Sequence, residues 1–256
     1  MMTQTIQTQF NDRILTVTLN RPEVMNALNS QMRAEITATL TDLPEGARCV
    51  VLTGAGRAFC SGQDLNDMQA ADDITGVLKR EYEPMLRAIT DCPVPVICAL
   101  NGVAAGAGAN LALVADVVIA AESAALVEAF SKIALIPDAG GTWFVPRLVG
   151  HARAMGMMLF SDAIPARKAE EWGLIYQVLP DADFVEGVAA RARALANGPT
   201  GCYRAIRRAV RESWSNDLEA QLTLEAELQG QAGTSPDFVE GVSAFLQKRK
   251  PQFTGQ

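Results

Sequence analysis

Residues 95–142 read PVICALNGVAAGAGANLALVADVVIAAESAALVEAFSKIALIPDAGGT, and this stretch decides the predicted fold. A β-rich run over residues 94–100 leads into a Gly/Ala-rich turn, and an apolar helical pattern over residues 110–114 follows the turn. A strand that enters a glycine turn and opens a helix presents free backbone N–H groups and the positive end of the helix dipole. Such a place suits a phosphate, a carboxylate or a developing oxyanion.

The alternation of strands and helices continues on both sides of this stretch. Residues 14–19 and 49–52 have the pattern of strands, and Asn29 is expected to cap a helix whose apolar residues recur at helical spacing. A later apolar helical stripe contains Pro84, which predicts a kink or two short helices. Strands that alternate with helices predict an α/β fold built from parallel βα units.

Toward the carboxyl end the pattern becomes purely helical. Residues 164–169 are expected to begin a helix and residues 174–179 to form a strand, after which strand signals end. The best boundary falls at the Asn-Gly-Pro-Thr sequence of residues 197–200. We therefore expect a core with the active site over residues 1–196 and a helical oligomerisation region over residues 197–256. Four helices are expected over residues 184–196, 203–213, 218–229 and 236–248.

Charge and composition exclude several classes of protein. The 256 residues are 49% hydrophobic and carry a net charge of −7, and no basic run stands out. Nucleic acid is therefore not expected as a partner, whereas a local basic pocket for a phosphorylated ligand stays open. Residues 95–121 are apolar enough to suggest a membrane span, but Asn101, Asn110 and Asp116 interrupt them and favour a buried α/β core.

The cysteines and the first ten residues indicate the cellular compartment of the protein. Cys49, Cys60, Cys92, Cys98 and Cys202 are odd in number, scattered and without a CxxC pair. This usage favours buried thiols in a reducing compartment over disulfides or a metal site. The start, MMTQTIQTQF, lacks the basic and apolar regions of a secretion signal. We therefore expect a cytoplasmic protein without a bound metal.

Two separate glycine turns follow strands, over residues 59–65 and 102–110. Either turn alone is typical of a tight connection between a strand and a helix. Together they could direct two backbone N–H groups at one carbonyl oxygen, which is the geometry of an oxyanion hole. The second turn matches neither the dinucleotide fingerprint nor the P-loop, and no lysine follows it, so nucleotide binding is disfavoured.

An acidic residue must supply any acid–base chemistry. His151 is the only histidine, it stands at an expected helix start, and no G-x-S-x-G accompanies it. Asp138 lies between Ile-Pro and Ala-Gly-Gly in apolar surroundings, where loss of hydration would raise its pKa toward neutral pH. A turn-forming role for Asp138 is the alternative. For Asp116, which stands directly before a strand, a structural turn role is favoured.

Four motifs carry a resemblance to a known family. They are NRP (residues 20–22), FCSGQDL (59–65), NGVAAGAG (101–108) and IPDAGGT (136–142). In this order and spacing they resemble the enoyl-CoA hydratase/isomerase (crotonase) superfamily, and the resemblance covers essentially the whole chain. It implies a crotonase-like spiral of ββα turns followed by a helical trimerisation region, with homotrimers or hexamers. It also implies acyl-CoA substrates, with CoA as part of the substrate and no separate cofactor.

The resemblance also implies the residues of the site. The backbone N–H groups of Gln63 and Ala107 would hold the thioester oxygen, and Asp138 would be the single acid/base. Asn110 and Phe130 stand where hydratases of the family carry two glutamates, and neither side chain can transfer a proton at neutral pH. The residues implied to contact the substrate are Met25, Ala27, Ala58, Gly62, Asp64, Leu65, Gly106, Asn110, Phe130 and Trp143.

Within the family, residues 101–110, 130–147 and 245–255 resemble the isomerases that rearrange ring epoxides of phenylacetyl-CoA. This branch implies conversion of the epoxide to a seven-membered oxepin, and a shift of a 3,4 double bond to the 2,3 position. Two other classes stay open, namely an enoyl-CoA hydratase and a non-catalytic acyl-CoA-binding subunit.

Overall fold

The computed structural model describes residues 4–69 and 73–256, with Met68 and Gln69 described as backbone only. Its main feature is a sheet of six strands in the spatial order β1-β2-β3-β5-β7-β10. The first two strands pair antiparallel, and all other neighbours in this sheet are parallel. The strands are β1 (Ile6–Asn11), β2 (Ile14–Leu19), β3 (Cys49–Gly54), β5 (Val96–Leu100), β7 (Val117–Ala121) and β10 (Gln177–Leu179).

A second sheet of four short strands lies beside the first, in the order β4-β6-β8-β9. Its strands are β4 (Ala58–Cys60), β6 (Val103–Ala105), β8 (Ala125–Val127) and β9 (Ile164–Pro165). The pairs β4–β6 and β6–β8 are parallel, and β8–β9 is antiparallel. Each of the two glycine turns found in the sequence therefore contains or follows a strand of this second sheet.

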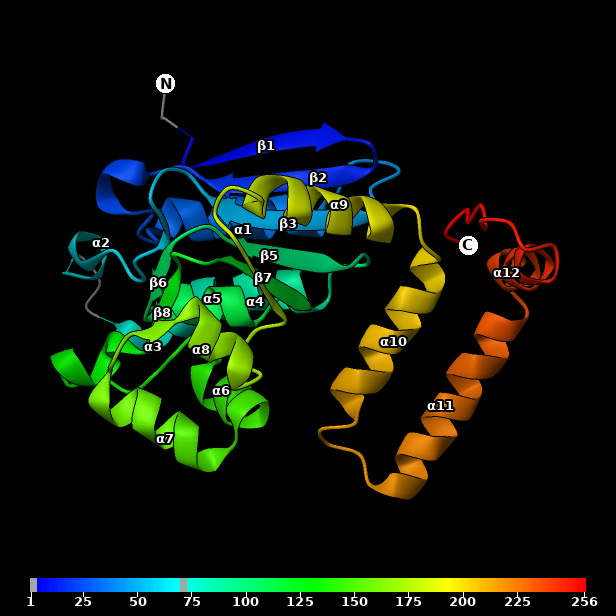
Figure 1. The fold of residues 1–256 in the computed structure, drawn as a ribbon. Helices are drawn as coiled ribbons and strands as arrows, with labels where there is room; N and C mark the ends of the chain where they lie inside the picture. Colours follow the sequence, from blue (N-terminus) through cyan, green and yellow to red (C-terminus); the bar gives the residue numbers. More distant parts are fainter. Residues whose placement is uncertain (1–3, 70–72) are drawn as a thin grey trace.

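Helices fill the connections between the strands. In Figure 1, α9 lies over the six-stranded sheet, while α1, α4 and α5 lie on its other face. The helical segments up to α9 are η1 (Pro22–Val24), α1 (Ser30–Thr41), α2 (Leu65–Gln69), α3 (Ile74–Val77), η2 (Leu78–Tyr82), α4 (Glu83–Thr90), α5 (Ala107–Leu113), η3 (Ala129–Ile133), α6 (Gly141–Val149), α7 (His151–Phe160), α8 (Ala166–Glu171) and α9 (Phe184–Ala196).

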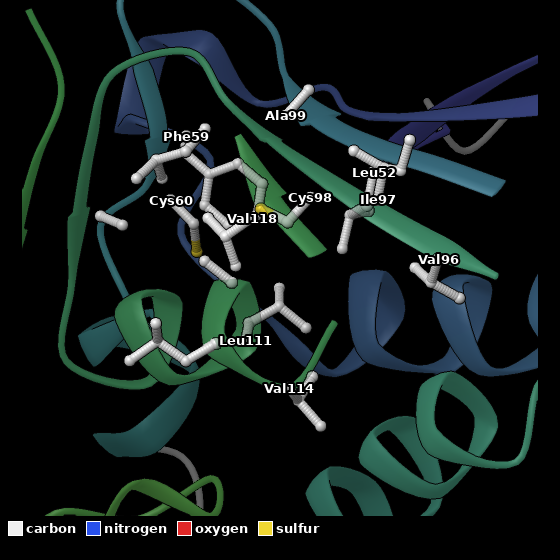
Figure 2. Packing of buried hydrophobic residues seen from close by; sticks show 14 of the residues in the cluster. Leu52, Phe59, Cys60, Val96, Ile97, Cys98, Ala99, Leu111, Val114 and Val118 are labelled. Atoms are coloured by element: carbon white, nitrogen blue, oxygen red, sulfur yellow. The ribbon is translucent and has the colours of Figure 1, made fainter. Parts of the chain in front are cut away.

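The core sits between the six-stranded sheet and these helices. Every residue of β5 is buried, as expected for a parallel strand that is covered on both faces. Figure 2 shows Phe59, Cys60, Cys98 and Val118 gathered above the helical segment that carries Leu111. The two glycine turns thus start from strands that are fixed by the core.

Several sequence predictions are confirmed. Asn29 caps α1, since its side-chain oxygen accepts a hydrogen bond of 2.9 Å from the Met32 N–H. The helical stripe around Pro84 is divided as predicted: η2 is a π-helix, and Pro84 stands in the first turn of α4. The five cysteines are free, with four of them buried, and His151 is exposed at the start of α7.

Two boundaries differ from the prediction. Ile164 and Pro165 form β9 rather than the start of a helix, because they pair with β8. Pro165, which has no N–H to donate, then stands at the N-cap of α8. The strand expected over residues 174–179 is shorter, since only Gln177–Leu179 pairs with β7.

The carboxyl-terminal region consists of three further helices, which Figure 1 shows beside the α/β body with α10 and α11 lying side by side. These helices are α10 (Thr200–Glu212), α11 (Leu218–Gly233) and α12 (Pro236–Leu246). They match the predicted helices to within a few residues. The division of the chain at residue 197 stays a prediction. Among the described residues, no helix combines the length and apolar character that crossing a bilayer requires.

Asp116 ties α10 to the sheet. Its carboxylate accepts hydrogen bonds of 2.8 Å from the Val96 N–H, from Arg207 and from Arg211. Both Arg207 and Asp116 are largely buried. The structural role favoured for Asp116 is therefore confirmed, and it extends to docking a helix that begins 84 residues later in the chain, at Thr200.

We expect Asp116→Asn to destabilise the protein by about 3 kcal/mol, because it leaves a buried arginine without its counter-charge. Urea unfolding followed by circular dichroism measures this change. The matched control is Glu212→Gln, which removes an exposed pair with Arg208 and should cost less than about 0.5 kcal/mol. Equal costs for the two variants would contradict the assignment.

Candidate active site

Two adjoining cavities open beside the glycine turns. The smaller, of about 290 Å³, is lined by both turns and by η3, and the larger, of about 750 Å³, is lined by α4, α6 and the loop before α6. Both cavities share Tyr82 and Asp138. The carboxyl group singled out in the sequence therefore lies where the two spaces meet.

Gln63 and Ala107 both line the smaller cavity. Gln63 forms an isolated parallel bridge with Leu28, in which the bonds are made by the Gly62 carbonyl and the Asp64 N–H. Among the described residues, none accepts a hydrogen bond from the Gln63 N–H. Ala107 is the first residue of α5, where backbone N–H groups have no partner within the helix. Two free N–H groups thus border one cavity.

Glycines allow the two turns to approach each other. Gly62 has a φ of +96° and Gly106 a φ of +52°, both in the region that disfavours side chains. A Cβ on Gly62 would lie 2.7 Å from the Ala105 carbonyl oxygen and 3.4 Å from the Ala107 nitrogen. The first turn therefore packs directly against the beginning of α5.

The NRP motif fixes the first turn from the other side. Arg21 donates a hydrogen bond of 2.8 Å to Asp64 and one of 2.7 Å to the Ala27 carbonyl. Burial alone would raise the pKa of Asp64, but the hydrogen bonds from Arg21 and from the Asn66 N–H outweigh it and lower the pKa. Asp64 is thus held as a charged anchor of the turn.

Arg33 was missed by the sequence reasoning and is the most connected polar side chain near the site. Only 1% of its surface is exposed. It donates to the Leu28 carbonyl at 2.8 Å, to Gln63 Oε1 at 2.9 Å, to Asp67 at 2.8 Å and to Glu81 at 2.6 Å. A sequence signal existed, because Arg33 stands three residues before the buried Ile36 and thus on the apolar side of α1.

Tyr82 completes this network at the boundary of the two cavities. Its hydroxyl donates to Gln63 Oε1 at 2.5 Å, and its ring lies beside the Arg33 guanidinium, 4.9 Å from the ring centre. Burial raises the pKa of Tyr82 far above its usual range, with a lowering effect of the Arg33 charge and a raising effect of Asp138. Tyr82 therefore remains a neutral donor.

Asp138 lacks the partners that Asp64 and Asp116 have. Its Oδ1 is buried and has no hydrogen-bond donor among the described residues. Burial raises the pKa of Asp138 to about 6, although its own backbone N–H and the Arg33 charge lower it. A carboxyl with this proton affinity can both accept and return a proton near neutral pH.

A second buried carboxyl, Glu128, is linked to the Asp138 main chain through Asn110. It is 1% exposed, and its pKa is raised to about 7 by burial, with a lowering contact from Asn110 and a raising effect of the Asp138 charge. The sequence reasoning missed it, although a single glutamate in the apolar run ALVEAF was a signal. Asn110, also 1% exposed, donates to the Asp138 carbonyl at 2.9 Å. The Asn110 carboxamide therefore lies behind the cavity wall.

The other expected substrate contacts divide between the two cavities and the surface. Leu65, Gly106 and Phe130 line the smaller cavity, and Trp143 lines the larger one. Trp143 also stacks edge-on against Trp214 with ring centres 6.1 Å apart, which links α6 to the region after α10.

Met25, Ala27 and Ala58 lie beside the first turn. The Met25 carbonyl accepts a hydrogen bond of 2.9 Å from the Ser61 N–H, and its side chain is 41% exposed. Ala27 and Ala58 are buried. Contacts of these three residues with the nucleotide part of a CoA ester stay predictions.

Comparison with known proteins assigns the family. A sequence model described as Enoyl-CoA hydratase/isomerase matches residues 9–256. The chain belongs to the enoyl-CoA hydratase/isomerase family. Its fold agrees with solved members, including an enoyl-CoA hydratase from Bacillus anthracis, with a TM-score of 0.92, 32% identity and coverage of 99% of this chain and 100% of that one.

Two relatives within the enoyl-CoA hydratase/isomerase family are especially similar. One, from Rhodobacter capsulatus, is named "probable enoyl-CoA hydratase" and is 56% identical over 253 residues, 98% of each chain. The other, from Escherichia coli, is named 1,2-epoxyphenylacetyl-CoA isomerase and is 49% identical over 250 residues, 95% of each chain. The names of these two relatives describe different reactions.

The raised pKa of Asp138 makes a prediction about stability. The folded protein binds the Asp138 proton more tightly than the unfolded chain does. The contribution of this proton to the free energy of unfolding is therefore fully present below about pH 4, and it is lost as the pH rises through about 6. Asp138→Asn removes this loss, and we expect the variant to be roughly 1–3 kcal/mol more stable than the wild type near pH 8.

Urea unfolding at about pH 5 and about pH 8 tests this linkage, since the gain should be smaller at the lower pH. Asp183→Asn changes an exposed aspartate in the same way and should give no pH-dependent difference. A gain from Asp138→Asn that is equal at both pH values would contradict the burial argument.

Proposed function

We propose that this protein is an isomerase of acyl-CoA thioesters in which Asp138 moves the proton. The observation that carries the proposal is one cavity that joins the free N–H groups of Gln63 and Ala107 to a single buried carboxyl of near-neutral proton affinity. The two N–H groups would bind the thioester oxygen and stabilise the negative charge that develops on it. The helix dipole of α5 would add to this stabilisation.

A single carboxyl group is sufficient for an isomerisation. Asp138 would remove a proton from one carbon of the acyl group, and the electrons would move onto the thioester oxygen as an enolate. Asp138 would then return the same proton to another carbon, so that no water is added and the carboxylate is regenerated. Asn110 and Phe130, at the positions of the family's glutamates, have no acid–base group for adding water.

The proposed substrate is a ring epoxide, 1,2-epoxyphenylacetyl-CoA, which would be converted to oxepin-CoA. Support comes from the name of the Escherichia coli relative and from the larger cavity. That cavity meets Asp138 and is lined by Leu86, Val114, Trp143 and Phe144, an apolar wall suited to a ring. A shift of a 3,4 double bond to the 2,3 position would use the same groups.

Hydration is the second candidate, because the Rhodobacter capsulatus relative is named a probable enoyl-CoA hydratase. Hydration adds a water to the double bond and would need a group to activate that water as well as one to deliver a proton. Glu128 is a second buried carboxyl, but it is not among the residues that line either cavity. Asp67 and Glu83 do line the cavities, but each is in an ion pair, with Arg33 and Arg87 respectively. The geometry therefore favours isomerisation.

We expect Asp138→Asn to lower kcat for both epoxide and 3-enoyl-CoA substrates about 10²–10⁴-fold, because the proton carrier is lost. In the wild type, kcat/KM should fall as the pH drops below about 6, where Asp138 becomes protonated. Product formation followed by chromatography of the CoA esters measures both effects, and Asp183→Asn is the matched control.

Three outcomes would contradict this proposal. Nearly wild-type isomerisation by Asp138→Asn would rule out the single-carboxyl mechanism. Absence of turnover in the wild type, with binding of CoA esters retained, would favour a non-catalytic acyl-CoA-binding protein. Efficient hydration of crotonyl-CoA, with ¹⁸O from solvent water in the product, would assign the protein to the hydratases.

We also propose that the carboxyl-terminal helices assemble the chain into trimers or hexamers. Several apolar side chains of α11 and α12 are exposed, including Leu218 at 74%, Phe245 at 82% and Leu246 at 74%. Exposed apolar side chains gathered on neighbouring helices are typical of a protein interface.

Light scattering coupled to gel filtration should give three or six times the mass of one 27.4 kDa chain. Phe245→Asp should shift the distribution toward smaller species, because it places a charge in the interface. Val185→Asp, at an equally exposed position of α9, is the control and should leave the mass unchanged. A monomer at micromolar concentration would rule out the assembly.

A further inference from the structure

Three buried oxygen atoms near the site lack a hydrogen-bond donor among the described residues. They are Oε1 of Glu128, Oδ1 of Asn110 and Oδ1 of Asp138. A buried acceptor without a donor costs roughly 1–3 kcal/mol, and native proteins contain few of them. Three such atoms lie on residues that Asn110 joins by hydrogen bonds, so this cluster differs from ordinary core.

Asn110 connects the two carboxyl-bearing residues. Its Nδ2 donates to the Asp138 carbonyl oxygen at 2.9 Å and lies 3.4 Å from Glu128 Oε2. The carboxamide also packs against Gly141, where an added Cβ would lie 2.7 Å from the Asn110 Cγ atom. The position of the Asp138 backbone is therefore set by an amide nitrogen that also donates to Glu128.

The main chain of Glu128 is held in place as well. Its carbonyl accepts a hydrogen bond of 2.5 Å from the hydroxyl of Ser161, a fully buried residue. That hydroxyl is in turn 2.7 Å from the hydroxyl of Ser131. The main chain of Glu128 is thus fixed at this place, and the carboxyl of this residue, which is 1% exposed, lies beside Asn110.

Few charged groups surround Glu128 and Asp138. Asn110 of α5 and Ser161, the residue after α7, approach Glu128 with neutral side chains, and Lys132 of η3 is exposed. The Asp138 charge acts on Glu128, and the Arg33 charge acts on Asp138. Tyr82, which is neutral, is coupled to Asp138 as well. An ion pair that could hold Glu128 permanently charged is absent from the described residues.

From this geometry we infer that Glu128 is a positioning residue of the active site: a buried carboxyl that, through the Asn110 amide, fixes the place of the Asp138 main chain and so of the Asp138 carboxyl. A protonated carboxyl has an O–H donor, which reduces the shortage of donors in the cluster. Glu128 does not touch the substrate in this role. The expected effect of Glu128 on turnover rests on the proposed function. The electrostatic coupling between the Glu128 and Asp138 carboxyls does not.

The sign of this coupling follows from the order of ionisation. Asp138 loses its proton first, near pH 6, and its charge then opposes ionisation of Glu128, which follows near pH 7. The two steps belong to the pair. Removing the Asp138 charge should therefore lower the pKa of Glu128, whereas replacing Glu128 by glutamine should leave the first step in place and remove the second.

The first test needs no enzymatic activity. Infrared difference spectra of protonated carboxyl groups are recorded across pH for the wild type, Glu128→Gln and Asp138→Asn, with Glu122→Gln, at an exposed glutamate, as the control. One carboxyl titrating near pH 7 should be missing only from Glu128→Gln, and it should titrate at lower pH in Asp138→Asn. No such carboxyl, or one unaffected by Asp138→Asn, would overturn the coupling.

The second test separates positioning from simple packing. Glu128→Leu should lower kcat for the isomerase substrates by about 10²-fold with a smaller change in KM, as expected for a displaced catalytic group. Glu128→Gln, which can still bond to Asn110, should restore most of the rate and lose the ionisation near pH 7 from the pH profile. Equal rates for the leucine and glutamine variants, or an unchanged pH profile in Glu128→Gln, would overturn the role.

The two tests also separate this inference from the proposed function. If the wild type does not isomerise acyl-CoA esters, the proposed function fails while the infrared coupling can still hold. If isomerisation is present but the coupling is absent, only the role of Glu128 fails. Should Glu128→Leu not fold, the glutamine variant and the infrared measurement still decide the question.

Discussion

The guanidinium of Arg33 is a full positive charge with almost no contact with water. Taking such an ion out of water is very costly unless carboxylates and hydrogen bonds compensate for the lost hydration. Here Asp67 and Glu81 supply the charge, while the Leu28 carbonyl and Gln63 supply further acceptors. Because these partners come from three separate segments, around Leu28, over residues 63–67 and at Glu81, compensating one buried cation holds the first glycine turn and the cavity wall together.

The buried acids of the molecule divide into two groups by their partners. Asp116 and Asp64 face arginines, so their charge is balanced and they serve to join distant segments. Asp138 and Glu128 have no ion pair with an arginine among the described residues, and Asn110 links Glu128 to the Asp138 main-chain carbonyl. Burial raises the pKa of both of these carboxyls, which is the property that proton transfer requires. Ion pairs with arginine thus mark the acids that join segments, and burial without such a pair marks the two acids to which we assign roles in the proposed proton transfer.

Much of the fold could be predicted from the sequence, for reasons that are local. Parallel strands such as β5 are apolar throughout, and the carboxyl-terminal helices have clear periodicity and caps. The strands β4 and β6 could not be found, because three residues are too few to show a period and their pairing is made across distant segments. Asp138, by contrast, could be predicted, because its apolar neighbours in the chain already indicate a buried carboxyl. The partners of Arg33 and the contact of Asn110 with Glu128 exist only once the chain is folded.

The π-helical turn η2 has a consequence for how this cavity can change over evolution. An α-helix advances by about 100° per residue, so one residue more or less in a helix rotates everything that follows to a different face. At η2 such a change would exchange Tyr82 for a neighbouring side chain at the meeting point of the two cavities. The sheets and both glycine turns would stay where they are. A scaffold of this kind can acquire a new cavity wall through a single insertion or deletion, while the two glycine turns are inherited intact.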